Sequence, residues 1–303
     1  MTLTLRQLEY FAAVARTLHF GSAATACRVT QPALSSQIQQ LENSLGTPLF
    51  ERNRRVVRLT DAGARLLPRA QSILSEVAGL RSAAAAHAPP LTGDLRLGVI
   101  PTVAPYALPQ FVPTARRRYP DLRLLIREDR TPDLVQQLAD GELDLLLLAL
   151  EADLGDVTTL PLYRDPFALA VPNGHPLGTT RPIKTSDLAE AELLLLEDGH
   201  CLRDQALDVC QIAGADEASD FRASSLNTLV RMVAAGTGMT LIPEIAIPTE
   251  VRSRDQVTLR RFGPRGPART IGLAWRRSSP RVEEFELLAT ALRETAPKAV
   301  RPA

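Results

Sequence analysis

Residues 30–46 decide the fold of the N-terminal region, and they read TQPALSSQIQQLENSLG. Thr30 is a favourable N-cap residue, and Pro32 suits the first turn of the helix that would follow. Gly46 ends this predicted helix, because glycine readily adopts the left-handed conformation of a helix C-terminus. The apolar residues of the stretch fall at a helical spacing that places them on one face: Leu34, Ile38, Leu41 and Leu45.

The opposite face of this predicted helix is polar but almost uncharged. A solvated helix would usually carry Glu and Lys there, whereas Ser, Gln and Asn are residue types that read base edges in a DNA major groove. We therefore predict a recognition helix rather than a plain surface helix. The candidate DNA contacts of this segment are Thr30, Gln31, Pro32, Ser35, Ser36 and Gln39.

Two shorter predicted helices precede the recognition helix. Residues 5–18 place apolar side chains at a helical spacing, and residues 22–27 form a short second helix. Arg28 and Val29 make the tight turn into the third helix. Cys27 lies among Ala and Val and is interpreted as a small core residue. This arrangement is typical of a helix-turn-helix domain that binds DNA.

Residues 50–59 read FERNRRVVRL and predict a two-stranded ribbon, or wing. Arginines on a protruding wing suit phosphate and minor-groove contacts, so Arg52, Arg54 and Arg55 are further candidate DNA contacts. The alternative is an edge hairpin protected by its charge, but the adjacent helices favour the wing. The charge balance also favours a polyanionic partner, because residues 1–70 carry a net charge of +5 and the remainder −4.

A long helix is predicted over residues 61–86, with Thr60 as its N-cap. Its apolar stripe is too long for a free linker and has no evident globular partner, so we expect it to pair with a second copy of the chain. Residues 88–90 read APP, which breaks the helix and marks a domain boundary. The apolar stripe consists of Leu66, Ile73, Leu74, Val77 and Leu80.

From residue 91 onward, strand-like apolar runs alternate with helical stretches, which predicts an α/β architecture with largely parallel sheets. Two units of about 80 to 100 residues would leave a cleft between them, where ligands normally bind. The predicted strands are residues 95–100, 122–128, 143–148, 167–171, 193–196, 239–243, 257–262 and 271–275. The predicted helices are residues 108–119, 132–140, 226–235 and 282–295.

The composition excludes several classes of protein. A chain of 303 residues that is 45% hydrophobic and 23% charged is typical of a globular protein of two or three domains. It has no apolar run long enough to span a membrane and no signal-peptide layout, so we expect a cytoplasmic protein. Three cysteines do not make a disulfide framework. No cofactor is expected.

A long set of short motifs in residues 23–63 resembles the DNA-binding signature of the LysR-type transcriptional regulators. Many members of that family carry Arg where this chain has Ser36. The motifs are Ala23-Ala24, Thr30-Gln31-Pro32-Ala33-Leu34-Ser35, Leu41-Glu42, Leu45-Gly46, Pro48-Leu49-Phe50-Glu51-Arg52 and Leu59-Thr60-Asp61-Ala62-Gly63.

The resemblance implies three parts: a winged helix-turn-helix domain over residues 1–60, a dimerising linker helix over 61–90 and an effector domain over 91–303. The effector domain would be periplasmic-binding-protein-like, with subdomain I at about 91–164 and 269–303 and subdomain II at about 165–268. The resemblance also implies a homotetramer that binds double-stranded promoter DNA and acts with RNA polymerase.

Within that family, the effector domain resembles the peroxide-sensing activators of oxidative-stress genes. The similar segments are residues 100–106, 196–205, 214–217, 221–226 and 275–276, together with Cys210. The resemblance implies that hydrogen peroxide attacks Cys201 and that Cys210 resolves it as a disulfide. It also implies that certain residues surround the reactive thiol: Thr102, Thr131, His200, Arg203 and Asp204.

The residues themselves support a reactive thiol. Only the thiolate reacts usefully with peroxide, so Cys201 needs a depressed pKa. Asp198 can cap a helix whose first turn holds His200 and Cys201, and the positive end of the helix dipole favours an anion there. Arg203 adds a positive charge nearby. Thr102 and Thr131 each follow a predicted strand and could hydrogen-bond a small polar oxidant.

The spacing of the two cysteines predicts a conformational barrier. An apolar stripe over residues 202–213 predicts one helix that contains both Cys201 and Cys210. Nine residues of helix separate their Cα atoms by roughly 13 Å, whereas a disulfide requires Cα atoms within about 7 Å. The bond therefore cannot close unless this helix unwinds.

Several alternatives remain open at this point. Cys201 and Cys210 could be inert buried cysteines, or with His200 part of a metal site, although three ligands at this spacing do not suit zinc. The chain could be a LysR-type regulator that binds a small metabolite in the effector-domain cleft. It could also be a thiol peroxidase, although such an enzyme has no use for a DNA-binding module.

Overall fold

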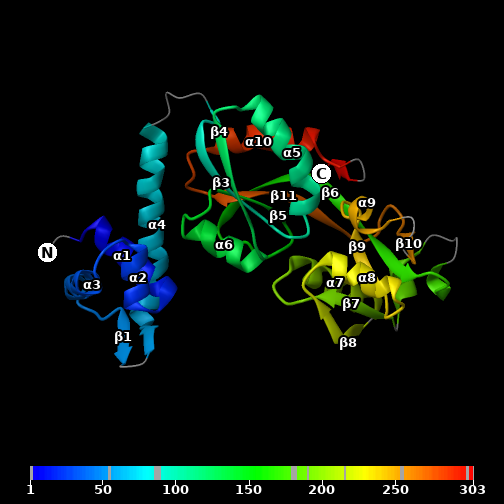
Figure 1. Ribbon diagram of the computed structural model, residues 1–303, viewed down its shortest axis with the longest axis horizontal. Coiled ribbons are helices and arrows are strands. Elements are labelled where there is room, and N and C mark those ends of the chain that lie inside the picture. Colours follow the sequence, from blue (N-terminus) through cyan, green and yellow to red (C-terminus); the bar gives the residue numbers. More distant parts are fainter. Residues whose placement is uncertain are drawn as a thin grey trace. The chain divides into compact units, whose positions relative to one another are not determined.

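The computed structural model describes residues 3–53, 56–84, 90–178, 183–189, 191–214, 216–252, 256–297 and 300–302 (Figure 1). The chain divides into two compact units, Met1–His87 with Ala139–Glu142 and Ala88–Leu138 with Leu143–Ala303. None of the described helices combines the length and apolar character needed to span a bilayer.

The first unit has the predicted winged helix-turn-helix. Helix α2 and helix α3 are joined by the turn at Arg28, whose φ of 56° lies in the left-handed region. The elements are α1 (Leu5–Thr17), α2 (Phe20–Ala26), α3 (Gln31–Leu45), the antiparallel ribbon β1 (Phe50–Asn53) and β2 (Val56–Leu59), and α4 (Asp61–Ala84).

Helix α3 packs on the other helices through its predicted apolar face. Leu34, Ile38 and Leu41 are fully buried, which confirms this part of the stripe. The prediction is wrong for Leu45, which is 38% exposed. In the last turns of the helix, the side chain of Glu42 turns inward instead.

The buried carboxylate of Glu42 fastens the recognition helix to the wing. Its Oε1 accepts hydrogen bonds from the backbone N–H groups of Leu49 (2.8 Å) and Phe50 (3.2 Å), at the start of β1. The Phe50 ring packs edge-on against Phe11 and Phe20, with centroids 5.6 and 5.9 Å away. One charged side chain thus satisfies two buried backbone donors and sets where the wing begins.

Helix α4 begins where Thr60 accepts a hydrogen bond from the Gly63 N–H at 2.9 Å, which confirms the predicted N-cap. The expectation that this helix lacks a globular partner within the chain is wrong for its first half. Ala70 is buried in the core of the first unit, and Leu66 and Leu74 pack against that core, because α4 lies beside α1. Ile73 remains 45% exposed.

The second unit is α/β, as predicted, but its large sheet is mixed rather than largely parallel. The large sheet has the order β10-β6-β11-β5-β3-β4, and both β9 and β12 pair with β6. Its strands are β3 (Gly93–Val99), β4 (Leu122–Glu128), β5 (Leu145–Ala149), β6 (Val157–Pro172), β9 (Thr240–Pro243), β10 (Val257–Arg261), β11 (Ala268–Arg276) and β12 (Arg301–Pro302).

Parallel pairing joins β3 to β4 and to β5, whereas β11 runs antiparallel to both β5 and β6. The second unit has two halves, one that contains β3, β4 and β5 and one that contains β9 and β10. Strands β6 and β11 connect these halves in opposite directions, which is the physical reason for the antiparallel pairing. Strand β6 begins beside β11 and ends beside β9 and β10 (Figure 1). The chain leaves the first half along β6 and returns along β11, so the two strands must be antiparallel.

Helices cover both halves of the second unit (Figure 1). Helices α5 (Ala104–Arg118), α6 (Thr131–Ala139) and α10 (Val282–Glu294) lie with the first half. The second half contains β7 (Glu192–Leu196), α7 (Cys201–Ala213), β8 (Asp216–Ala223), α8 (Leu226–Ala234) and α9 (Ile247–Glu250). Strand β8, parallel to β7, was not predicted because its DEASDFRA sequence is polar and lacks regular alternation.

Replacing Glu42 with Ala should destabilise the first unit, because the N–H groups of Leu49 and Phe50 would be left buried without their acceptor. Each such group costs roughly 1–3 kcal/mol, so we expect a loss of several kcal/mol in the free energy of unfolding. Chemical unfolding of the full chain, followed by circular dichroism, measures it. The matched control is Gln40→Ala, an exposed position of the same helix; equal stability of the two variants would contradict the assignment.

Candidate functional site

Cys201 is the first residue of helix α7, at the end of the loop that follows β7. Its free thiol is buried, and the residue is 5% exposed. Gly199 allows the chain to turn into the helix, because its φ of +88° is one that L side chains rarely adopt. A Cβ at this position would also lie 3.1 Å from Cδ of Arg130. The thiol is therefore held at a tightly packed helix start.

A buried ion pair lies beside this thiol, and no pattern in the sequence predicted it. Arg269 of β11 and Asp165 of β6 are direct partners in the strand register, and both side chains are fully buried. Arg269 Nε donates to Asp165 Oδ2 at 3.0 Å. Its Nη1 and Nη2 donate to the hydroxyl (2.8 Å) and the carbonyl (2.9 Å) of Thr102. The guanidinium thus joins β6, β11 and the segment that follows β3.

Thr131 opens helix α6 and brings a second hydroxyl to the site. Within the described part of the chain this buried hydroxyl has no hydrogen-bond partner. It nevertheless lies close enough to the Cys201 thiol to favour the thiolate. A buried hydroxyl without a partner is unfavourable unless a ligand or water completes its hydrogen bonds. Thr131 is therefore suited to contact a small polar molecule beside the sulfur.

Burial raises the pKa of the Cys201 thiol above its ordinary value, because desolvation penalises the thiolate. The positive charge of Arg269 is the largest opposing effect, and the Thr131 hydroxyl also lowers the pKa. The expectation of a depressed pKa is therefore wrong for this geometry. The cation that acts on the sulfur is Arg269, which reaches it from a strand distant in sequence, rather than Arg203.

Arg203 instead belongs to an ion-pair network that anchors α7. Its guanidinium donates two hydrogen bonds to Glu217 of β8, at 2.7 and 2.8 Å, and its Nε lies 2.8 Å from Asp198 Oδ1. Arg222 pairs with the same two carboxylates. The predicted N-cap role of Asp198 is replaced by these ion pairs, because its carboxylate faces two arginines. Asp204, on the next position of the helix, is exposed.

Arg130 joins the segment that carries Thr131 to the loop that carries Cys201. Its Nη2 donates to Glu197 Oε2 at 2.7 Å, and its Nη1 donates to the carbonyl oxygen of Asp198 at 3.0 Å. Burial and the charge of Arg130 lower the pKa of His200, which precedes the thiol. His200 is therefore a neutral imidazole at neutral pH.

Cys210 lies on helix α7 with Cys201, as predicted, although its side chain lies outside what the structure describes. Nine residues of helix place the two Cα atoms roughly 13 Å apart, beyond the reach of a disulfide. Cys27 is partly buried against the core of the first unit, as expected of a small core residue.

The candidate DNA contacts lie on one exposed face of α3. The residues exposed there are Gln31, Pro32, Ser36 and Gln39, and Ser35 is half-buried. Thr30 occupies the N-cap position without a side-chain cap hydrogen bond, which leaves its hydroxyl available for DNA. Arg54 and Arg55 lie outside the described residues, and of Arg52 only the backbone, in β1, is described.

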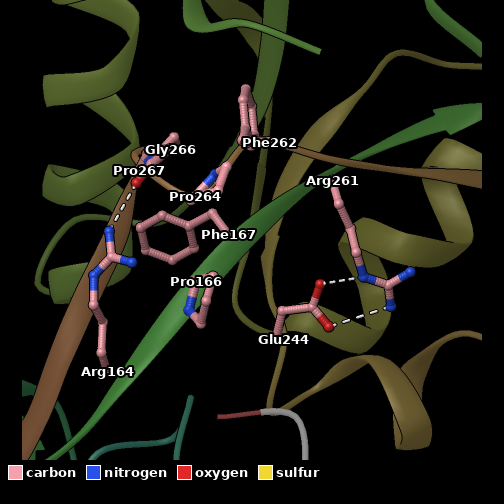
Figure 2. Close-up of a pocket in the computed structure, with 10 residues that line it drawn as sticks. Arg164, Pro166, Phe167, Glu244, Arg261, Phe262, Pro264, Gly266 and Pro267 are labelled. Carbon is pink, nitrogen blue, oxygen red and sulfur yellow. Dashed lines mark hydrogen bonds and ion pairs between the residues drawn. The ribbon is translucent and has the colours of Figure 1, made fainter. Parts of the chain in front are cut away.

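The second unit also has a cavity of about 430 Å³ whose walls do not include the thiol (Figure 2). Strand β6, the residue after β9, strand β10 and the loop between β10 and β11 form its walls. The lining residues are Arg164, Pro166, Phe167, Glu244, Arg261, Phe262, Gly263, Pro264, Gly266 and Pro267.

The two groups of DNA contacts should differ in their effect. Gln39→Ala should change which sequence is bound, because this exposed amide lies on the face of α3 that is predicted to read base edges, whereas Arg52→Ala should weaken binding to all sequences. Each lost phosphate contact should lower the slope of log affinity against log salt by about 1. Selection from a randomised duplex library and salt titrations measure both. A changed sequence preference with unchanged affinity in Arg52→Ala would contradict these roles.

Thr131→Val should separate reactivity from stability. Without the hydroxyl, the pKa of Cys201 rises further, so oxidation by peroxide slows and its pH profile shifts to higher pH. The free energy of unfolding should not fall, because an unpartnered buried hydroxyl is removed. Peroxide kinetics against pH and urea unfolding measure these effects.

Thr240→Val is the matched control for that experiment. The Thr240 hydroxyl is buried and donates to the Leu194 carbonyl at 2.7 Å, so its removal should lower stability by about 1–2 kcal/mol with no change in the oxidation rate. Identical pH profiles for Thr131→Val and the unmodified chain would contradict the role of Thr131.

The comparisons with known proteins agree on the family over nearly the whole chain. Residues 5–64 match the bacterial regulatory helix-turn-helix protein, lysR family, and residues 89–297 match the LysR substrate binding domain. The chain is 48% identical over 292 residues to a probable hydrogen peroxide-inducible genes activator of Streptomyces viridosporus, covering 96% of this chain and 94% of the relative. It is 44% identical over 291 residues to the DNA-binding transcriptional dual regulator OxyR of Escherichia coli, covering 96% and 95%.

Solved structures extend the likeness to the fold. A full-length OxyR variant from Pseudomonas aeruginosa matches with a TM-score of 0.80 and 36% identity, covering 100% of this chain and 98% of that one. A peroxide-bound OxyR mutant from Corynebacterium glutamicum matches with a TM-score of 0.67 and 39% identity, covering 97% and 93%. The chain therefore belongs to the LysR family of bacterial helix-turn-helix regulators, in the group of OxyR-type hydrogen peroxide-inducible genes activators.

Proposed function

We propose that this chain is a transcriptional activator that senses hydrogen peroxide through Cys201 and Cys210. The observation that carries the proposal is the surroundings of Cys201: a buried thiol acted on by a fully buried cation, Arg269, and by the buried Thr131 hydroxyl, which has no other hydrogen-bond partner among the described residues. A second thiol lies on the same helix. The relatives named as peroxide-inducible activators support the oxidant and the class of output.

The proposed chemistry has two steps. The Cys201 thiolate attacks one oxygen of hydrogen peroxide, the O–O bond breaks, and the departing hydroxide takes up a proton to leave as water. The Cys201 sulfenic acid is then attacked by the Cys210 thiolate, which forms the S–S bond and releases a second water. The two thiols lose two electrons and the peroxide gains them.

The buried groups serve the first step in different ways. Arg269 stabilises the thiolate by its charge and holds the Thr102 hydroxyl as an acceptor, so the Thr102 hydrogen remains available to a peroxide oxygen. Thr131 supplies the second hydroxyl. Because the thiol is buried and its pKa is raised, the reactive thiolate is a minor species at neutral pH, and the site favours a small uncharged oxidant that can enter.

The second step requires the first turns of α7 to unwind. Arg203 holds this part of the helix to Glu217 and Asp198, and Arg130 holds the preceding loop through Glu197. These ion pairs are lost or rearranged when Cys201 moves toward Cys210. When the disulfide forms, the first turns of α7 and the ion pairs that hold them are therefore lost. As a result, the surface around α7 changes.

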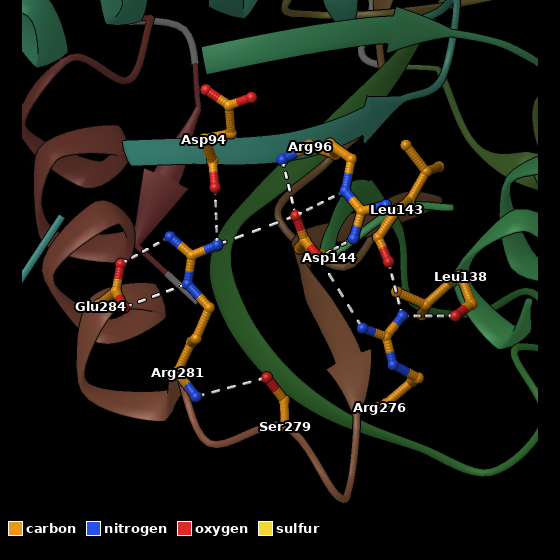
Figure 3. A network of polar contacts seen from close by, with 9 residues as sticks. All are labelled: Asp94, Arg96, Leu138, Leu143, Asp144, Arg276, Ser279, Arg281 and Glu284. Carbon is orange, nitrogen blue, oxygen red and sulfur yellow. Dashed lines mark hydrogen bonds and ion pairs between the residues drawn. The ribbon is translucent and has the colours of Figure 1, made fainter. Parts of the chain in front are cut away.

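We propose that strands β3 and β11 carry this change toward the linker. Arg269 lies near the start of β11 and Thr102 follows the end of β3, and the opposite ends of these strands lie in the network of polar contacts that Figure 3 shows. In that network Arg96 on β3 binds Asp144, and Arg276 at the end of β11 donates to the carbonyls of Leu138 and Leu143. Arg281 binds Glu284, which accepts the N–H of Leu91, where the chain enters this unit.

The proposed assembly is a homotetramer, with dimers formed through the linker helix. The exposed Ile73 on α4 favours such pairing, because the rest of the apolar stripe in this half of the helix is covered within the chain. The proposed partners are double-stranded promoter DNA and RNA polymerase, which places the protein in the cytoplasm.

Single-cysteine replacements test this function. Cys201→Ser should abolish the response to peroxide, Cys210→Ser should accumulate a sulfenic acid on Cys201, and Cys27→Ser should respond normally. Thiol mass spectrometry after one equivalent of peroxide, with promoter binding measured in parallel, follows each step. A normal response from Cys201→Ser would refute the sensor assignment.

Weakening the anchor of α7 should speed the second step alone. In Glu217→Gln the carboxylate that holds Arg203 becomes neutral, so we expect disulfide closure to accelerate several-fold while sulfenic acid formation is unchanged. Rapid-quench sampling resolves the two rates. Asp208→Asn, at an exposed position of the same helix, is the control; equal closure rates in both variants would exclude an anchoring role for Glu217.

A further inference from the structure

The cavity of Figure 2 shares strand β6 with the buried ion pair, because Arg164 and Pro166 of its wall flank Asp165. In the register of β6 and β11, Arg164 is paired with Thr270, Asp165 with Arg269 and Pro166 with Ala268. Asp165 is buried against Arg269 beside the thiol, whereas its neighbours Arg164 and Pro166 line the cavity.

The walls of the cavity combine an apolar surface with one cation, Arg164, most of whose N–H donors have no partner among the described residues. Phe167, Phe262 and three prolines supply the apolar surface (Figure 2). The guanidinium of Arg164 donates one hydrogen bond among the described residues, to the Gly266 carbonyl at 2.9 Å. A guanidinium has five N–H donors, so Arg164 can still bind a ligand.

The second arginine of the cavity is already neutralised. Arg261 Nε donates to Glu244 Oε1 at 2.6 Å, and its Nη2 donates to Oε2 at 3.3 Å. The charges of Arg261 and Glu244 cancel. Among the lining residues, the charge that remains for a ligand is therefore the positive charge of Arg164. The charge and the apolar walls together favour a monoanion with an apolar body.

The loop that closes the cavity is preformed. The Gly266 N–H donates to the Gly263 carbonyl at 2.8 Å, which closes a turn. A Cβ on Gly266 would lie 2.3 Å from Cβ of Phe262, so only glycine allows the phenyl side chain to fold over the turn. Pro264 and Pro267 restrict the backbone on either side. A preformed wall lowers the entropic cost of binding.

We propose that this cavity is a second ligand site, for a small organic acid with a flat apolar body. A carboxylate can form two parallel hydrogen bonds with Arg164, and a flat ring can pack against the half-buried Phe262. The volume of about 430 Å³ lies in the range of small-molecule sites. Neither the peroxide chemistry nor the DNA-binding surface uses this cavity.

Occupancy of the site should alter the reactivity of Cys201. A ligand that binds Arg164 and Pro166 contacts the two residues of β6 on either side of Asp165. Asp165 in turn binds the guanidinium of Arg269, which stabilises the Cys201 thiolate. The site would therefore add a metabolic input to the peroxide response. This coupling rests on the proposed function, whereas the binding itself does not.

Titration calorimetry on the full-length reduced protein, with benzoate as the probe, tests the site. Benzamide is the uncharged comparison ligand. We expect benzoate to bind at least tenfold more tightly than benzamide, and to lose at least tenfold in affinity in Arg164→Gln with partial recovery in Arg164→Lys. Arg265→Gln, on the same loop but outside the cavity wall, should bind as the unmodified chain does. No binding at millimolar benzoate, or equal binding to Arg164→Gln, would overturn the proposal.

The rate of Cys201 oxidation by hydrogen peroxide, with and without saturating benzoate, tests the coupling. We expect a change of at least twofold in the unmodified chain and none in Arg164→Gln. If benzoate binds through Arg164 and the rate stays constant, the site stands and the coupling is refuted. If Cys201 does not react with peroxide at all, the proposed function fails, and the calorimetry still decides the site.

Discussion

The buried pair of Arg269 and Asp165 is the interaction on which the effector domain depends. Two fully buried charges are costly to desolvate, and such a pair is tolerated only when further hydrogen bonds satisfy its remaining groups. Here Thr102 supplies two acceptors to Arg269, and the Ile245 N–H donates to Asp165 at 3.1 Å. The pair thus fastens both crossing strands and the segment after β3 at one point. Removal of either partner would leave an uncompensated charge inside the fold.

The same pair sets the balance at Cys201. Burial favours the protonated thiol, whereas Arg269 and Thr131 favour the thiolate, and burial prevails. The sulfur of Cys201 is thus poorly accessible to solvent, and the positive charge of Arg269 stabilises it most strongly once it has ionised. Reactivity therefore depends on groups brought together by the fold, and anything that moves β6 or β11 acts on the thiol.

Local features of the sequence predicted much of this arrangement. The recognition helix, the wing, the N-cap at Thr60 and the placement of both cysteines on one helix follow from short-range patterns, and the structure contains each of them. Arg269 and Asp165 could not be predicted in the same way. They are 104 residues apart and meet only because β6 and β11 pair antiparallel. The sequence likewise suggested Arg203 as the charge near the thiol, whereas a carboxylate on the unpredicted strand β8 holds it elsewhere.

We propose that the disulfide between Cys201 and Cys210 cannot form while α7 is intact. Hydrogen–deuterium exchange of the α7 amides, compared between the reduced chain, the disulfide form and the sulfenic acid of Cys210→Ser, tests it most directly. We expect protection over the first two turns to be lost in the disulfide form and retained in the other two. Full protection of α7 in the disulfide form would contradict it.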